Sequence, residues 1–156
     1  MGKFNNKIEA EFDPPRKWIL SLALTYTNPD IDEDALERVG VEIKGSKISV
    51  KKDFVTDLAS VPRMCWAFIA PWDVARAAII HALLYKRIRQ NRKAHSTGLK
   101  KSEDPKVISE AKKASDDVFH MAMKDADPSV PGWKIAAAYY SVRMFGRWSI
   151  IPREGD

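Results

Sequence analysis

The candidates for chemistry in this chain are histidine and carboxylate side chains in apolar surroundings. His81 lies in the segment 77-AAIIHALLY-85, and helical spacing turns it to the same side as Ala78, Leu84 and Tyr85. An imidazole in that position is suited to metal binding or to proton transfer near neutral pH. It is equally suited to a hydrogen-bonded place in the core, so both interpretations stay open.

Asp57 is the second candidate, in the stretch 54-FVTDLASVPR-63. It follows a strand-like run and precedes a turn of small residues, where an aspartate can cap backbone N–H groups. Alternatively, it faces His81 as an orienting carboxylate or as a metal ligand. Arg63 and Arg143 are the candidates for neutralising it, and Arg143 is notable because it lies in an otherwise apolar helix, where half of an ion pair is expected.

A third candidate is one member of the pair Asp116-Asp117. Neighbouring helix positions diverge by about 100°, so only one of the two carboxylates can face a given site. Asp116 faces it if Phe119 and Met123 point inward, and Asp117 does if Met121 points inward. Both carboxylates could instead be solvated, and the helical phase leaves the choice open.

The elements that would position these residues change from strands to helices along the chain. Strand-like runs cover residues 7–12, 18–27 and 39–54. The last run predicts a β-hairpin, because Gly45-Ser46 separates two alternating stretches and glycine tolerates the positive φ of a tight turn. The acidic segment 30–39 is predicted to be a loop or one short helix.

The second half has helical periodicity. Helices are predicted over residues 74–90, from Pro105 to about Lys124, and over 133–145. Asp73 is the expected N-cap of the first helix, and Gly146 is expected to end the last one. The predicted fold class is therefore α+β, with a small antiparallel N-terminal sheet packed against about three C-terminal helices. One domain over 1–156 is expected, β-rich over 1–60 and helical over 73–146.

Composition indicates a globular protein of one domain. The chain has 156 residues, of which 45% are hydrophobic and 30% charged. Cys65 is the only cysteine, so no intrachain disulfide can form. No apolar run reaches the roughly 20 residues of a membrane span, and the N-terminus lacks the apolar core of a signal peptide. We therefore expect the protein in the cytoplasm where it is made, or packaged from there.

Charge and exposed apolar residues suggest surfaces for partners. The formal net charge is +5, and the segment from Lys86 to Lys101 is basic without an acid. This segment is either a solvated helix end or a patch for a polyanion such as nucleic acid, although no recognised nucleic-acid motif accompanies it. The candidate partner-binding residues are Trp66, Phe68, Trp72, Arg87, Arg89 and Arg92.

Four motifs in order resemble one known family. They are 53-DFVTDLASVPR-63, 77-AAIIHALLY-85, 115-SDDVF-119 and 140-YSVRMFG-146. They look like the family called domain of unknown function 1353, which occurs in bacteriophage and prophage genomes, and the resemblance extends from Lys3 to about Trp148. It implies a polar site made of Asp57, His81, Asp116 and Arg143. The chain departs from the family at Ala82, where the family usually has aspartate, and at Lys112, where it often has arginine.

Two functions are compatible with this resemblance. The first is a non-catalytic virion or assembly component that binds other phage proteins, with self-association as an open alternative. The second is a small metal-assisted His/Asp hydrolase of cell-wall or nucleotide substrates, in which Asp57, His81 and Asp116 are catalytic and a divalent metal is the cofactor. Ala82 cannot bind a metal, which favours the first. A sealed and mutually satisfied cluster would favour the first function, and a solvent-reachable metal geometry the second.

Overall fold

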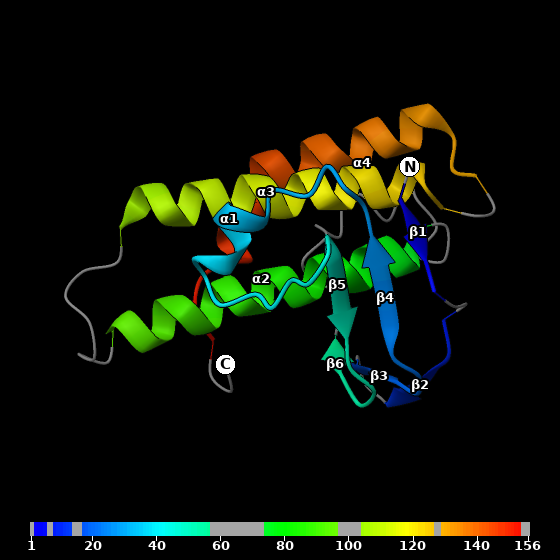
Figure 1. The fold of residues 1–156 in the computed structure, drawn as a ribbon, viewed down its shortest axis with the longest axis horizontal. Coiled ribbons are helices and arrows are strands. Elements are labelled where there is room, and N and C mark those ends of the chain that lie inside the picture. Colours follow the sequence, from blue (N-terminus) through cyan, green and yellow to red (C-terminus); the bar gives the residue numbers. More distant parts are fainter. Residues whose placement is uncertain are drawn as a thin grey trace.

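Two small antiparallel sheets lie beside a group of helices (Figure 1). The computed structural model of the chain describes residues 2–5, 8–13, 17–56, 74–96, 104–126 and 129–153. Strands come first along the chain and the long helices follow. This arrangement confirms the predicted α+β class. No helix in the described ranges is both long enough and apolar enough to cross a membrane.

The first sheet packs against the helices. It contains β1 (Lys3–Phe4), β4 (Leu24–Thr27) and β5 (Lys47–Val50) in the order β1-β4-β5. In β5 the buried Ile48 and Val50 alternate with exposed neighbours, because successive side chains of a strand point to opposite faces. The buried face of β4 and β5 contacts α2 (Ala75–Ser96).

The second sheet contains β2 (Ala10–Asp13), β3 (Lys17–Leu20) and β6 (Val55–Thr56), in the order β2-β3-β6. The prediction of one continuous strand over 18–27 was therefore wrong, since β3 and β4 belong to different sheets. The chain leaves the second sheet at Leu20, whose backbone N–H donates to Phe54 O at 3.0 Å and whose C=O accepts from Asp53 N at 2.7 Å. Strand propensity alone does not show where a chain changes sheets.

The predicted hairpin over 39–54 was also wrong. Residues 41–44 form no strand, and β5 pairs with β4 instead. Val41 and Ile43 are both buried, so the alternation in this stretch reflects burial rather than strand pairing. The turn chemistry was correct, because Gly45 and Ser46 have φ of 59° and 56°.

The acidic segment forms the short helix α1 (Glu33–Glu37), which was one of the two alternatives. Asp32 is its N-cap, and its carboxylate accepts a hydrogen bond from Ala35 N at 3.2 Å. Helix α1 contacts α3 (Pro105–Lys124).

Helix α3 lies between α2 and α4 (Gly132–Phe145), which is followed by a 3₁₀ turn, η2 (Gly146–Trp148). The predicted bounds of α3 are confirmed, with Pro105 in its first turn and Asp104 accepting from Lys106 N at 2.9 Å. Helix α2 extends six residues beyond its predicted end at residue 90. Its predicted N-cap, Asp73, lies outside the described residues.

Gly146 ends α4 for a different reason from the one predicted. Its φ is −64°, so it is not a left-handed cap. A Cβ at this position would run into the Tyr85 hydroxyl. Glycine is therefore needed here because the end of α4 lies directly against a side chain of α2.

The inward faces of α2 and α3 follow the predicted helical stripes. The predicted positions on α2 are Val74, Ala77, Ala78, His81, Leu84, Tyr85 and Ile88, and all are buried. The predicted positions on α3 are Ile108, Ala111, Ser115, Val118, Phe119 and Ala122, and these are buried too. The two stripes meet where polar residues interrupt them, and this meeting point is the candidate site.

Candidate functional site

A buried carboxylate, Asp116, lies at the centre of a polar cluster. Its Oδ1 accepts hydrogen bonds from His81 Nε2 at 2.9 Å and from the Tyr85 hydroxyl at 2.5 Å. Its Oδ2 accepts from Lys112 Nζ at 2.8 Å and from Arg143 Nη1 at 3.0 Å. Both oxygens therefore have two donors each, and the Asp116 side chain has no exposed surface.

Three helices supply these five residues. His81 and Tyr85 are one turn apart on α2, and Lys112 and Asp116 are one turn apart on α3, so each pair shares one helical face. Arg143 comes from the last turn of α4. The cluster therefore links all three long helices through a single carboxylate.

Lys112 has a second set of partners at the end of α4. Besides Asp116, its ammonium group donates to Val142 O at 3.0 Å and to Arg143 O at 3.4 Å. Carbonyl groups at a helix C-terminus have no partner within the helix and carry partial negative charge, so a cation is favoured there. Lys112 is almost completely buried. Its three hydrogen bonds explain how a lysine is accommodated in that environment.

The electrostatic environment keeps Asp116 ionised. Burial alone would raise the pKa of this carboxyl, but the hydrogen bonds from His81, Lys112 and Tyr85 outweigh burial and lower its pKa to about 2. The Tyr85 hydroxyl responds in the opposite sense, since burial and then the nearby Asp116 charge raise its pKa. Tyr85 is therefore a neutral donor to an ionised acceptor.

His81 is neutral in this environment. Burial lowers its pKa, and the positive charge of Lys112 lowers it further, while Asp116 acts in the opposite direction. Because the carboxylate accepts from Nε2, the proton of the neutral ring is assigned to Nε2 and the lone pair to Nδ1. Nδ1 is buried and has no hydrogen-bond partner among the described residues. The ring packs against the rings of Tyr85 and Phe119, with centroid distances of 4.0 and 4.8 Å.

The adjacent acid, Asp117, has a different environment. It accepts from Lys113 at 2.6 Å and from the Tyr139 hydroxyl at 2.8 Å, and it is partly exposed. Burial and this hydrogen bond raise the pKa of Tyr139 to about 12. Phe119 is fully buried. The helix therefore has the orientation that was predicted to turn Asp116, rather than Asp117, inward.

Several predicted site residues lie outside the described part of the chain. They are Asp57, Arg63, Trp66, Phe68 and Trp72. The proposed meeting of Asp57 with His81 therefore stays a prediction, as do the partner-binding roles in this segment. Of the other predicted site residues, the structure brings His81, Asp116 and Arg143 together.

The three arginines predicted to bind partners have separate environments. Arg89 donates to Ser149 O at 3.1 Å, and Arg92 donates to Ile150 O at 2.8 Å. These bonds hold the segment after η2 against α2. Arg87 is exposed and bonds Gln90 of its own helix at 3.1 Å. A partner for the three arginines stays a prediction.

Two members of the cluster were not predicted as site residues. Lys112 lies four residues before Asp116, the spacing of a helical ion pair, and this signal could have identified it. Tyr85 lies four residues after His81 on the predicted apolar stripe. Its hydroxyl requires a buried partner, which is the second signal.

A separate polar cluster fixes the N-terminal strand. Asp125, directly after α3, accepts from the Tyr26 hydroxyl at 2.5 Å, from Asn28 Nδ2 at 3.2 Å and from Gly2 N at 3.1 Å. Burial and the hydrogen bond to Asp125 raise the pKa of Tyr26 well above its usual value. These contacts fasten β1 and β4 to the end of α3.

The described residues contain no group of three histidine, cysteine, aspartate or glutamate side chains arranged to hold a metal ion. His81 and Asp116 are in contact through Nε2 of the imidazole ring. The other ring nitrogen, Nδ1, does not bond the carboxylate and is the one that could bind a metal. A metal at this place would need further ligands from outside the described residues.

Fold and cluster together define a small α+β protein whose helices are joined through a buried ion-pair network. Residues 36–142 match the family described as "Protein of unknown function (DUF1353)", and the chain belongs to this family. The matched range contains His81, Tyr85, Lys112 and Asp116 and ends one residue before Arg143. Comparisons with curated proteins and with solved structures found no match.

Proposed function

We propose that this chain is a non-catalytic bacteriophage protein, a virion or assembly component, in which the Asp116 cluster is structural. One observation carries the proposal: both Asp116 oxygens already have two hydrogen-bond donors, and the carboxylate is fully buried. A catalytic carboxylate must reach a substrate or a water molecule. Asp116 would have to give up one of its four hydrogen bonds to do so.

The protonation state supports the same conclusion. A general base works best when its pKa lies near the working pH. The pKa of Asp116 is about 2, so this carboxylate has little tendency to take a proton at neutral pH. Its negative charge instead pairs with both cations that converge on it, Lys112 from α3 and Arg143 from α4.

Exposed apolar side chains on the outer side of α4 support a role in binding another protein. Trp133, Tyr140, Met144 and Trp148 are all more than half exposed. They recur at intervals of seven, four and four residues, so on the helix they share one side, which continues into η2. Large exposed apolar side chains gathered in this way mark protein interfaces. We name these four residues the α4 ridge and propose that it contacts another protein of the same particle.

The test is mass spectrometry of purified phage particles from cells that produce this chain. We expect the chain in the particles at a fixed ratio to the other virion proteins. The double variant Trp133→Ala/Tyr140→Ala should lose at least about tenfold in incorporation, as expected for aromatic hot-spot residues. Leu22→Ala is the control, because Leu22 is also exposed but lies between β3 and β4 rather than on α4. Absence of the wild-type chain both from particles and from assembly intermediates would overturn the proposal.

A second function, a metal-assisted hydrolase, is favoured by one specific observation. The lone pair on Nδ1 of His81 is buried and has no partner within the described ranges, while Nε2 is oriented by a carboxylate. Metal-binding histidines commonly have this arrangement, in which the second nitrogen donates to a carboxylate. Thermal unfolding with Zn²⁺ or Mn²⁺ tests it. A stabilisation that disappears in His81→Gln, together with elemental analysis showing stoichiometric metal, would support the hydrolase, and no bound metal would exclude it.

A further inference from the structure

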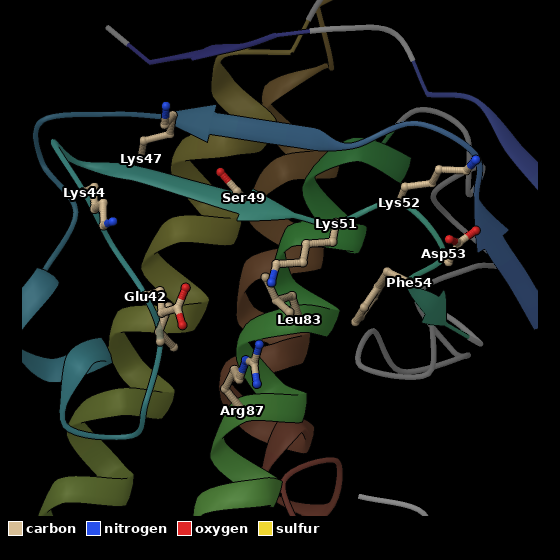
Figure 2. A pocket seen from close by; sticks show the side chains of 11 residues that line it. Glu42, Lys44, Lys47, Ser49, Lys51, Lys52, Asp53, Phe54, Leu83 and Arg87 are labelled. Atoms are coloured by element: carbon tan, nitrogen blue, oxygen red, sulfur yellow. The ribbon is translucent and has the colours of Figure 1, made fainter.

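A basic depression lies on the opposite side of α2 from the Asp116 cluster. It has a volume of about 400 Å³ and lies between β5, the segments on either side of β5, and α2 (Figure 2). Its cationic lining residues are Lys44, Lys47, Lys51, Lys52 and Arg87. Pockets of a few hundred Å³ are the size that small ligands occupy.

Cations outnumber acids among the described residues that line this depression. Five cations line it there against two acids, Glu42 and Asp53, which leaves a formal charge of +3 (5 − 2) for the described lining. Within the described part of the chain, none of these five cations makes an ion pair. Cations held close together repel one another, and their positive potentials add up within the depression. An anion that enters is therefore attracted by all of them and relieves the repulsion.

Part of the lining comes from a strand and a helix, β5 and α2. Lys47 and Ser49 alternate with the buried Ile48 and Val50 on β5, so they share its solvent face with Lys51 just beyond. Figure 2 shows the Lys51 side chain extending from just beyond β5 toward α2, and the Arg87 side chain extending from α2 toward β5. The two cations therefore approach the same space from two elements.

The position on α2 separates the depression from the Asp116 cluster. Leu83 and Arg87 line the depression, whereas His81 and Tyr85 contact Asp116. Residues two positions apart on a helix differ by about 200° in direction, so these pairs lie on opposite sides of α2. A ligand in the depression would not contact the cluster, and the inference is independent of the function proposed above.

The depression also has an apolar part. Val41 and Leu83 are buried residues in its lining, and Phe54 is a partly buried aromatic ring beside them. Lys86 lies over the Phe54 ring, 5.4 Å from its centroid. Cations around an aromatic ring are the combination that nucleotide-binding surfaces use, with cations for phosphate and the ring for the base.

We propose that this depression binds a nucleoside phosphate, either free or as one unit of a single nucleic-acid strand. The phosphates contact Lys51 and Arg87, with Lys44 at the rim, and the base lies against Phe54. The two acids line the same space and supply acceptors for base or sugar hydroxyl and amino groups.

The experiment measures binding of a fluorescent 12-residue single-stranded oligonucleotide by anisotropy, and of adenosine triphosphate by competition. The site variant is Lys44→Gln/Lys51→Gln/Arg87→Gln. The control variant, Lys3→Gln/Lys17→Gln/Lys124→Gln, removes the same charge from exposed positions outside the depression. We expect at least about tenfold weaker binding for the site variant and a change within about twofold for the control. Circular dichroism confirms that both variants fold.

Further measurements address the source of the phosphate and the role of the ring. Competition by adenosine triphosphate indicates a free nucleotide, and binding of the oligonucleotide alone indicates a strand; both results support the proposal. For the oligonucleotide, affinity falls as salt rises, so the slope of log affinity against log salt is negative. The site variant should make this slope shallower, reducing its magnitude by about two. Phe54→Leu should weaken nucleotide binding several-fold and leave inorganic triphosphate unaffected.

Three outcomes overturn the proposal. The first is equal loss of binding in the site and control variants, which would reflect net charge alone. The second is displacement of the oligonucleotide by polyglutamate as readily as by nucleotide, which would indicate an acidic protein partner. The third is the absence of binding by either probe at low salt.

Discussion

Lys112 and Asp116 form an ion pair of 2.8 Å within one turn of α3, and this pair also joins α3 to the end of α4. An exposed helical pair with this spacing stabilises a protein by only about 0.5 kcal/mol. The pair in α3 is buried, and Lys112 also donates to carbonyl groups of α4, so losing either partner leaves a charge in the interior. The pair is therefore a tertiary link rather than a local one.

Asp116→Asn is predicted to lower the free energy of unfolding by about 3–5 kcal/mol, because it leaves the charge of Lys112 buried without its counter-ion. Urea denaturation followed by circular dichroism measures this change. Asp117→Asn is the control, since Asp117 is partly exposed, and it should cost less than about 1 kcal/mol. Equal effects of the two substitutions would contradict a special role for Asp116.

Acid should weaken the same link within a defined pH range. The pKa of Asp116 is lowered from 3.8 to about 2 in the folded protein. A depressed carboxyl pKa contributes stability that is present above the unfolded value and is lost as the pH falls through the folded value. The stability difference between wild type and Asp116→Asn should therefore shrink from pH 4 to pH 2, and urea titrations across that range measure it. A constant difference would count against the lowered pKa.

Gly146→Ala is predicted to destabilise the protein by about 1–3 kcal/mol, because a methyl group there meets the Tyr85 hydroxyl. The hydroxyl is the nearest atom, so Tyr85→Phe removes much of the obstruction as well as one bond to Asp116. The double variant should thus be more stable than the sum of the single effects predicts, by about 0.5–3 kcal/mol. Strict additivity in thermal or urea unfolding would show that the two positions do not touch.

The helices were predictable from the sequence because each signal is local. Apolar periodicity and a proline at the helix start, here Pro105, both operate within a few residues. The same periodicity placed Asp116 inward through Phe119. The convergence of Asp116, His81 and Arg143 from three helices was not visible in local spacing, and it was expected only from the family resemblance.

Strand pairing was less predictable because its partners are distant in the chain. β5 pairs with β4 across twenty or more residues rather than with the adjoining residues 41–44, and β3 pairs with β6 across a still longer interval. The buried Val41 and Ile43 gave a strand-like alternation although their segment packs without pairing. Burial and pairing leave the same pattern in a sequence, and only the tertiary arrangement separates them.

Stability is predicted to fall as the pH decreases from 7 to 5, because His81 is held neutral. Its folded pKa is lowered by burial, so below pH 6.5 the unfolded chain binds a proton that the folded protein excludes. Stability from this group is complete above pH 6.5 and decreases below it, by at most about 1.4 kcal/mol per pH unit. Asp116, Lys112 and Tyr85 are the polar groups that face the ring from α2 and α3.

Two variants separate the contribution of His81 from that of His120, whose pKa is also lowered. His81→Gln should flatten the profile of unfolding free energy between pH 7 and 5. His120→Gln should leave most of the slope, because His120 is only partly buried, although its pKa is lowered in the same direction. An unchanged slope in His81→Gln would mean that another group causes the pH dependence.

Asp125→Ala is predicted to release the N-terminal strand before the rest of the fold. The substitution removes the acceptor of Tyr26, Asn28 and Gly2 at once, and unsatisfied buried donors cost about 1–3 kcal/mol. Hydrogen exchange of the Asn5 amide, which bonds Thr25 O at 3.1 Å across β1 and β4, should accelerate by about tenfold or more, while amides in the middle of α3 change less. Asp30→Ala is the control, since Asp30 is exposed next to the same cluster and should leave the exchange of β1 unchanged. Equal acceleration in both variants would show that the charge of this region, rather than the Asp125 hydrogen bonds, holds β1 in place.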